Sequence, residues 1–390
     1  MKGPFYPLSL LVIASGLALS YGSPMAMEKA PASMPPIQSD AMHSPAYQRL
    51  AVMLAQYQTL AEKGGWPTLP SGPKIEPGAT DDRIPILRDI LYRMNDLKED
   101  DSDQPTLYDA VLLEAVEHFQ LRHGLTEDGV IGKETLIALN TPVEKRITQI
   151  EATMKRLEEF SAADDRYILV NIPEYMLRAF SDGTLAAQMK VIVGTPKDRT
   201  PIFTKQMTYV SFNPHWGVPI RIAAQEMLPK IIENPEFFHE QDFALYEIID
   251  GERVEIDPIT VDWTQYNKDH FPFLLRQRPG KGNALGKIKF GLKNSNDIYL
   301  HDTSNPKLFA KDIRALSHGC MRVEKPYELA QFVVTGKKNF TPEKLDKLYN
   351  GEESDMVSIP ALPVYVVYWT AWANEDGTIH FRKDIYGMDK

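Results

Sequence analysis

The chain has a single cysteine, Cys320, and two histidines lie near it in the sequence, His301 and His318. A thiol is a poor nucleophile until it ionises, and ionisation needs a base or a positive charge beside it. Arg322 adds such a charge two residues later, and Gly319 leaves the backbone open to a substrate. This set predicts a reactive thiol whose pKa is lowered by its neighbours. The alternatives are a small buried hydrophobic side chain or an intermolecular disulfide.

We expect the two histidines to have different roles. His301 ends a predicted strand, and a sheet can hold a general base in a fixed position. His318 lies on the loop of the sulfur, where it would orient the loop or donate a hydrogen bond beside the oxyanion. The backbone N–H groups of His318, Gly319 and Cys320 are the expected oxyanion donors. Either the carboxylate of Asp302 or a backbone carbonyl would hold His301 in its productive tautomer.

A metal site is another interpretation of neighbouring histidine and cysteine. One cysteine and two nearby histidines supply at most three ligands, and a Cys-x-x-Cys pair is impossible with one cysteine. We therefore expect neither a bound metal nor another cofactor.

Composition and charge narrow the possible partners. A chain of 390 residues with 43% hydrophobic residues is long enough for two or three domains with real cores. Its formal net charge of −10 at pH 7 argues against a nucleic-acid partner, because phosphates are bound by clustered Lys and Arg.

The first residues have the layout of a secretory signal. Lys2 precedes an apolar run from Pro7 to Leu19, and small residues follow. The run is short for a membrane span. We expect residues 1–26 to be a signal, cleaved on export to the periplasm or cell envelope. If it is retained, this N-terminus would be the chain's membrane tether.

The rest of the chain divides by pattern into helical and β-rich parts. Residues 27–46 are rich in Pro, Ser and Met and indicate a disordered tether. We assign residues 47–80 to a helical scaffold, 81–145 to a small helical domain and 146–165 to a helical linker. Residues 166–390 form a mainly β domain, into which a lid is inserted at about 221–272. The fold class is therefore α+β and multidomain.

Periodicity gives the individual elements. Helices are predicted over residues 47–63, 84–97, 107–123, 133–139, 143–160 and 221–232. Strands are predicted over residues 167–171, 177–180, 186–193, 207–212, 287–290 and 298–301. The last two strands, 364–370 and 378–381, form a hairpin by pattern.

Residues 115–140 resemble the small helical peptidoglycan-binding domain found beside many wall enzymes. The resemblance rests on Phe119-Gln120, Gly124-Leu125, Asp128-Gly129, Gly132, Thr135 and Leu139-Asn140. Most of these residues are also what the core and turns of a helical bundle require, so binding to glycan is an implication of the resemblance alone.

The run S-H-G-C-x-R at Ser317 to Arg322, after a strand ending in His301, resembles the active-site signature of the L,D-transpeptidase family with its YkuD-type domain. The resemblance extends over residues 167–390 and implies a sheet sandwich or barrel. With its lid and binding module, the chain resembles the lid-bearing, YcbB-like subgroup. Arg278 departs from that subgroup, which often has a smaller or uncharged residue there.

The resemblance implies a reaction on peptidoglycan. Cys320 would attack the third-position diaminopimelate carbonyl of a donor tetrapeptide stem, and an amine of an acceptor stem would then take the acyl group. Carbapenems, which are β-lactams, would be covalent inhibitors. Asn213, Trp216, Arg276 and Asn283 are candidates for lining the donor site, or else residues of the sheet core and turns.

Three other functions stay open. The same thioester could be given to water, as in an L,D-carboxypeptidase or endopeptidase, or to a lysine of a small protein that is attached to the wall. The chain could also be a non-catalytic wall-binding protein.

Overall fold

The computed structural model describes residues 44–99, 102–160, 164–234, 236–293 and 298–390. The predicted signal and most of the predicted tether lie outside these residues. The first helix begins at Pro45, where the Ser44 side chain accepts a hydrogen bond from the Tyr47 N–H, so the last two residues of the predicted tether are helical. Within the described ranges, no helix combines the length and apolarity that crossing a membrane requires.

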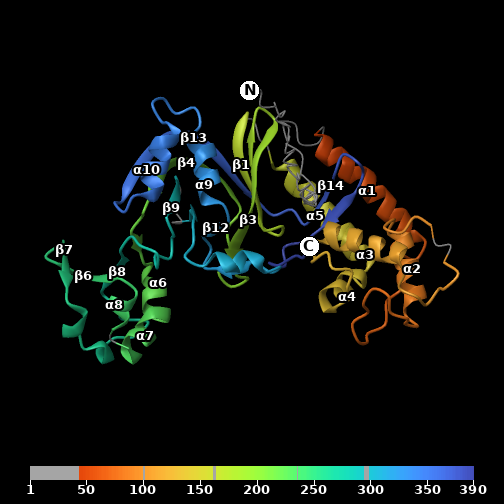
Figure 1. The fold of residues 1–390 in the computed structure, drawn as a ribbon, viewed down its shortest axis with the longest axis horizontal. Helices are drawn as coiled ribbons and strands as arrows, with labels where there is room; N and C mark the ends of the chain where they lie inside the picture. Colours follow the sequence, from red (N-terminus) through yellow and green to blue (C-terminus); the bar gives the residue numbers. More distant parts are fainter. Residues whose placement is uncertain (1–43, 100–101, 161–163, 235, 294–297) are drawn as a thin grey trace, which may run out of the picture. The chain divides into compact units, whose positions relative to one another are not determined.

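Over residues 44–99 and 102–160, which the structure describes, the N-terminal part has five helices; their arrangement is drawn in Figure 1. They are α1 (Pro45–Glu62), α2 (Ile84–Arg93), α3 (Ala110–His123), α4 (Lys133–Leu139) and α5 (Val143–Glu158). The Asp109 side chain caps α3 by accepting from the Leu112 N–H, and Gly124 ends the helix in the left-handed conformation. Residues of α2, α3 and α4 enclose one core with Leu87, Val116 and Phe119 at its centre. Residues 47–80, assigned to a helical scaffold, contain one helix, α1. Ile75 of this range already belongs to the core of α2, α3 and α4, where it forms a β-bridge with Ile131.

The C-terminal part is built on a closed sheet. Its strands are β1 (Arg166–Asn171), β2 (Met176–Ser181), β3 (Thr184–Gly194), β4 (Phe203–Phe212), β9 (Ile288–Leu292), β10 (Leu300–His301), β11 (Ala315–Ser317), β12 (Met321–Val323) and β13 (Asp355–Val367). They pair in the order β11-β3-β12-β10-β9-β4-β13-β1-β2, and β2 also pairs with β3. This second pairing closes the sheet into a barrel. The predicted fold class, a helical domain followed by a mainly β domain, is confirmed.

The barrel has an apolar interior. Side chains from every wall gather there, including Val170, Val191, Val210, Phe290 and Met321. Helix α9 (Pro326–Val334) adds further side chains to this core, and α10 (Pro342–Asn350) and the short helix η4 (Pro306–Ala310) follow and precede it outside the sheet.

The outer face of one wall is shared with the helices. Along β1 the side chains alternate, so Val170 points into the barrel while Leu169 joins a second core. That second core contains Leu50 of α1, Ile150 of α5 and Phe381.

The predicted C-terminal hairpin is wrong in its first strand. Residues 364–367 belong to β13, which pairs with β1 and β4 in the barrel. The hairpin is formed instead by β14 (Ala371–Ala373) and β15 (Ile379–Phe381). The barrel pairings join β13 to strands about 150 to 200 residues away, and a local pattern carries no information on such partners.

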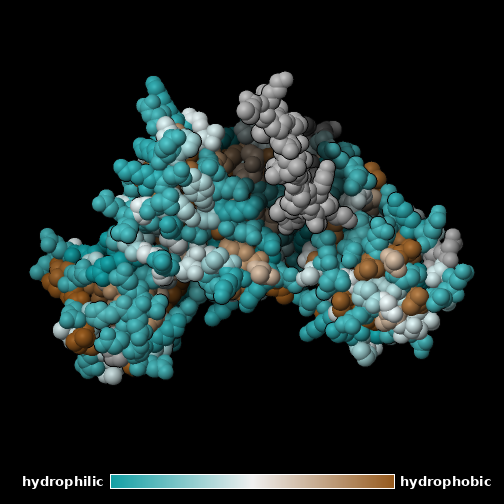
Figure 2. Space-filling model, in the orientation of Figure 1, coloured by the Kyte–Doolittle hydropathy of each residue, from teal (hydrophilic) through white to brown (hydrophobic). Residues whose placement is uncertain are grey.

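The lid region contains its own sheet and core. It comprises β5 (Trp216–Gly217), α6 (Ile220–Ile222), the π-helix η1 (Ala223–Met227), α7 (Leu228–Glu233), α8 (Phe237–Glu240), β6 (Phe243–Ile249), β7 (Glu252–Ile256), the short helices η2 (Pro258–Thr260) and η3 (Trp263–Gln265), and β8 (Leu274–Gln277). Its strands pair as β5-β8-β6-β7 in a sheet of their own. Phe238, Leu245 and Trp263 are buried at the centre of its core. Figure 2 shows some hydrophobic patches over these elements, and Ile248 and Ile259 are among the exposed side chains of the region.

Candidate active site

The three strands β9, β10 and β12 bring the predicted site residues together. In the register of the sheet, His301 of β10 pairs with Arg322 of β12 on one side and with Lys289 of β9 on the other. Their neighbours Leu300, Met321 and Phe290 point into the barrel core. Since side chains alternate along a strand, His301, Arg322 and Lys289 share the opposite face of the wall.

Cys320 immediately precedes β12, two residues before Arg322. Adjacent strands lie about 4.8 Å apart, and diagonal neighbours across two strands are within reach of long and aromatic side chains. In this register the half-buried Cys320 is a diagonal neighbour of His301 across the two strands.

The imidazole of His301 is fixed by a backbone carbonyl. Its Nδ1 donates to the carbonyl oxygen of Asp302 at 2.6 Å, and the side chain is buried. Burial, together with the positive charge of Arg322, lowers the pKa of His301 to about 3. The ring is therefore neutral, and with its proton on Nδ1 it carries a lone pair on Nε2.

The carboxylate of Asp302 serves the backbone instead. Its two oxygens accept from the N–H groups of Lys287 and Thr303 at 2.8 and 2.7 Å. Burial raises the pKa of Asp302, against the effect of these hydrogen bonds. Of the two groups that the sequence left open for orienting His301, the structure supplies the backbone carbonyl.

The pKa of the Cys320 thiol lies above its ordinary value. Burial raises the pKa of Cys320, and hydrogen bonds with Tyr299 and the charges of Lys289 and Arg322 oppose this rise only in part. Arg322 lowers the thiol pKa as predicted, but the predicted net lowering is wrong, because the cost of desolvating a thiolate exceeds the attraction to the two cations. Burial also lowers the pKa of Arg322. Its Nε has no hydrogen-bond partner among the described residues.

Tyr299 is a site residue that the sequence analysis missed. It hydrogen bonds with Cys320, its ring lies 5.6 Å from that of His301, and the Nζ of Lys289 lies 4.0 Å from its ring centre. A signal was present, because Tyr299 stands two residues before His301 and alternation puts both on one face.

The loop around Cys320 is held by the Ser317 hydroxyl. Ser317 Oγ donates to the carbonyl of Cys320 at 2.6 Å and accepts from the Gly319 N–H at 3.1 Å. Gly319 has a φ of +112°, which favours glycine. The Gly319 N–H, one of the predicted oxyanion donors, is therefore bonded to Ser317 in this structure.

His318 faces the lid region. Its Nε2 lies 2.7 Å from Oε1 of Glu226 in the π-helix η1, and both side chains are part-exposed. A second contact lies nearby in sequence, where Arg221 pairs with Asp198 at 2.9 Å. The run from α6 to α7 therefore contacts both the Cys320 loop and the segment after β3.

Two of the four candidates for the donor site have structural roles. The Asn213 amide donates to the carbonyls of Leu348, Gly351 and Glu353, behind α10. Asn283 is buried, and its amide donates to carbonyls at residues 214 and 278. Because these amides donate to backbone carbonyls, they stabilise turns and are not available to a substrate.

The other two candidates lie in the lid sheet. Trp216 of β5 is half-buried and packs against Phe243, with ring centres 6.2 Å apart. Arg276 of β8 is half-buried and pairs with Gly217. Arg278 follows β8 and is exposed, where it pairs with Asp242 and Glu255 on the lid itself.

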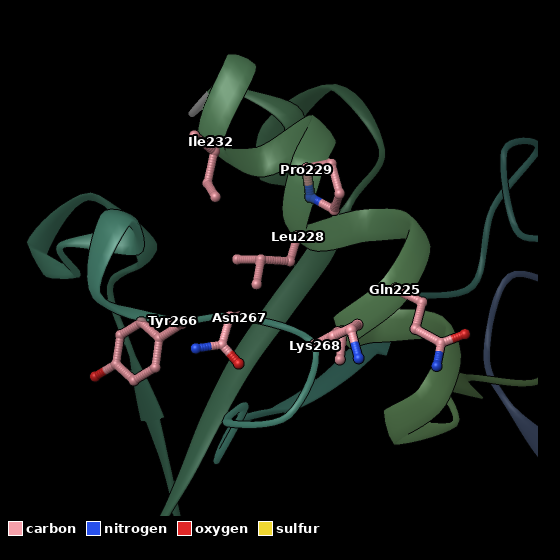
Figure 3. A pocket seen from close by; sticks show the side chains of 8 residues that line it. Gln225, Leu228, Pro229, Ile232, Tyr266, Asn267 and Lys268 are labelled. Atoms are coloured by element: carbon pink, nitrogen blue, oxygen red, sulfur yellow. The ribbon is translucent and has the colours of Figure 1, made fainter.

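A pocket of about 770 Å³ opens within the lid region (Figure 3). One side is formed by the helical run with Gln225, Leu228 and Ile232, and the other by the loop with Tyr266 and Lys268. None of the predicted site residues lines it. In the described ranges, His, Cys, Asp and Glu side chains form no group of three or more that could hold a metal ion.

Comparisons with known proteins match both parts of the chain. Residues 165–343 match the model of the YkuD family, described as "L,D-transpeptidase catalytic domain", and residues 80–139 match that of a "Putative peptidoglycan binding domain". A Haemophilus influenzae protein described as "Putative L,D-transpeptidase" is 35% identical over 286 residues, which are 71% of this chain and 57% of that protein. This chain therefore spans less than two thirds of that relative's length.

Solved structures show only weak overall likeness. An L,D-transpeptidase from Stackebrandtia nassauensis is 15% identical, covers 80% of this chain and 99% of its own, and has a TM-score of 0.26. L,D-transpeptidase 3 from Mycobacterium tuberculosis, in complex with a faropenem-derived adduct, is 14% identical over 54% of this chain and 64% of its own, with a TM-score of 0.24. TM-scores this low add nothing to the assignment.

Proposed function

Residues 165–343 belong to the L,D-transpeptidase family, and from this premise we propose that the protein cross-links peptidoglycan stem peptides through a thioester on Cys320. The observation that supports this most directly is the pairing of β10 with β12. It makes His301 the direct neighbour of Arg322 and a diagonal neighbour of Cys320, and Nδ1 of His301 is bonded to the carbonyl of Asp302. The free lone pair of Nε2 is then the acceptor for the thiol proton.

In the first step, the sulfur attacks the carbonyl of the third residue of a donor tetrapeptide stem. The thiol proton passes to Nε2 of His301 as the S–C bond forms, because burial disfavours a charge on either group before attack. The C–N bond to the terminal D-alanine then breaks, and the leaving amine takes the proton from His301. A thioester remains on Cys320.

In the second step, a side-chain amine of an acceptor stem attacks the thioester. His301 accepts a proton from this amine, the C–S bond breaks, and the proton returns to the sulfur. The product is a link between two third-position diaminopimelate residues. Water attacking in place of the amine would make the enzyme an L,D-carboxypeptidase or endopeptidase.

The lid region is the proposed means of excluding water. Its helical run contacts the Cys320 loop through Glu226 and the adjoining segment through Arg221, so it stands beside the thioester. Excluding water protects a reactive intermediate from hydrolysis. These contacts favour transfer to an amine over transfer to water.

The helical module and the N-terminus support the location of the reaction. We propose that the module matched at residues 80–139 holds the enzyme on peptidoglycan. The apolar run after Lys2 supports export to the periplasm or cell envelope. Fractionation of cells that express the full chain tests this, and recovery in the cytoplasmic fraction contradicts it.

The reaction is tested with purified protein and disaccharide-tetrapeptide muropeptides, with products read by mass spectrometry. We expect a cross-linked dimer from the wild type and no product from Cys320→Ala. A tripeptide monomer alone would identify the hydrolytic enzyme, and unchanged substrate would identify a non-catalytic wall-binding protein.

A carbapenem supplies an independent probe of the nucleophile. We expect one covalent adduct by intact mass on the wild type and none on Cys320→Ala. An adduct that persists on the variant would overturn the role of Cys320.

A further inference from the structure

The hydroxyl of Thr200 connects two segments that are far apart in the sequence. Thr200 lies between β3 and β4 and is 2% exposed. Its Oγ1 accepts from the Gly194 N–H and donates to the carbonyl of Gly319, both at 2.8 Å. A hydroxyl has one proton, and here that proton goes to the residue before the nucleophile.

The carbonyl of Gly319 and the N–H of Cys320 belong to the same peptide unit. A trans peptide is planar, and its C=O and N–H point in opposite directions. A hydrogen bond that fixes the carbonyl of Gly319 therefore also fixes the direction of the Cys320 N–H. Thr200 thus controls a donor that it does not touch.

The flanking peptide units are held by a different residue. Ser317 Oγ accepts from the Gly319 N–H and donates to the carbonyl of Cys320. Only the central unit, between Gly319 and Cys320, is held by Thr200. The oxyanion of an acyl transfer forms beside the sulfur, where the N–H of the nucleophile's own residue is a natural donor.

A second hydroxyl supports Thr200 without touching the Cys320 loop. Tyr386 is buried; its hydroxyl accepts from the Thr200 N–H at 3.1 Å and donates to the carbonyl of Gly194 at 2.7 Å. The segment from Gly194 to Thr200 is therefore held at both ends by Tyr386. The hydroxyls of Thr200 and Tyr386 can be removed one at a time, so their effects can be measured separately.

We propose that Thr200 is a positioning residue that aims the backbone N–H of Cys320 at the oxyanion of the tetrahedral intermediate. This inference rests on the proposed function, because it requires that Cys320 attacks a carbonyl. It assigns to Thr200 a role in acylation that is distinct from its contribution to folding.

The test compares two reactions of the same sulfur. Acylation by a carbapenem creates an oxyanion, whereas alkylation by iodoacetamide displaces iodide from a tetrahedral carbon and creates none. We expect Thr200→Val to slow acylation about a hundredfold, the scale of losing one oxyanion donor, and to leave the alkylation rate close to that of the wild type. Thr200→Ser keeps the hydroxyl and should acylate nearly as fast as the wild type.

Tyr386→Phe is the matched control for damage to the segment. It removes two hydrogen bonds beside Thr200 but leaves the bond to Gly319, so acylation should change little even where thermal unfolding shows a loss of stability. If Thr200→Val does not fold, Thr200→Ala and Thr200→Ser are compared in the same two assays, with the same expected split.

The inference is overturned if acylation and alkylation fall together, if Thr200→Val acylates like the wild type, or if Tyr386→Phe loses acylation as fully as Thr200→Val. Failure of the proposed function gives a different result. In that case the wild type itself shows no carbapenem adduct at Cys320 by peptide mapping.

Discussion

The loop that contains Cys320 and the lid region that contacts it are held in different ways. Three successive peptide units of the loop have hydrogen bonds to Ser317 or Thr200, two buried side chains. The two polar contacts made by Arg221 and Glu226 of the lid are part-exposed, with side-chain exposures of 44% and 20% for Arg221 and Asp198, and 37% and 42% for His318 and Glu226. Part-exposed pairs contribute about 0–1 kcal/mol each.

The firmly held loop suits groups that react, and the weakly held lid suits a part that controls entry to the site. Groups that react must keep their geometry within a fraction of an ångström, and buried hydrogen bonds to a closed sheet provide that. Under the proposed function, a cover over the site has to admit and release long stem peptides, and weak contacts permit such movement. The lid has its own sheet and core, so it can shift without disturbing β10 or β12.

The largest expected effect concerns His301, the proposed general base, which lies in the barrel sheet beside the Cys320 loop. Replacing His301 with Ala should slow acylation about a hundredfold or more, the scale of losing a general base. His301→Asn can still donate to the carbonyl of Asp302 but lacks Nε2, so it should be as slow. His318→Ala should cost less, because the His318 imidazole contacts the lid. Stopped-flow carbapenem acylation measures all three, and a larger loss for His318→Ala would reverse the assigned roles.

The second prediction tests whether the buried thiol of Cys320 is neutral. Because burial raises the pKa of Cys320 above its ordinary value of 9.0, only a small thiolate fraction exists at neutral pH. Alkylation by iodoacetamide should rise about tenfold per pH unit from pH 6.5 to 8.5, without a plateau below pH 9.

A matched variant separates the thiol from the imidazole. His301 has a pKa of about 3, so it is neutral throughout this range and His301→Asn should give the same slope. A plateau near pH 6 in the wild type, lost in the variant, would show a resting thiolate–imidazolium pair and contradict the neutral site.

Much of the fold follows from local patterns in the sequence. The predicted helix over residues 133–139 has the bounds of α4, and those over 143–160 and 47–63 differ from α5 and α1 by at most two residues at either end. What failed was pairing over long distances. Strand β13 begins at Asp355 and includes Pro360 and Pro363, which disfavour a strand locally, yet the barrel supplies partners on both sides.

The resemblance to the L,D-transpeptidase family is confirmed, but the details of the site depended on the fold. His301 donates a hydrogen bond to the carbonyl of Asp302, and Asn213 donates one to the carbonyl of Gly351 after α10. Both bonds depend on backbone positions that the spacing of residues in the sequence does not reveal. Thr200 is 119 residues from the carbonyl it binds. The pKa of the thiol depends on burial, which the run S-H-G-C-x-R does not specify.

The smallest expected effect concerns the lid region and its contact with His318. Glu226→Gln should weaken the contact with His318 while leaving the rigid site intact. Carbapenem acylation should then stay near the wild-type rate. Weakening a part-exposed polar contact costs up to about 1 kcal/mol, so the ratio of hydrolysed tripeptide to cross-linked dimer should rise by at most about fivefold.

Glu233→Gln is the matched control for this change in charge. Glu233 is an exposed carboxylate at the end of α7, on the same helical run. It should leave the ratio of tripeptide to dimer unchanged, because it removes the same charge without the contact to His318. If both variants raise the ratio equally, the overall charge of the lid controls access and the contact with His318 does not. If Glu226→Gln instead slows acylation as much as His301→Asn, the lid is part of the rigid site, and the division drawn between the two regions fails.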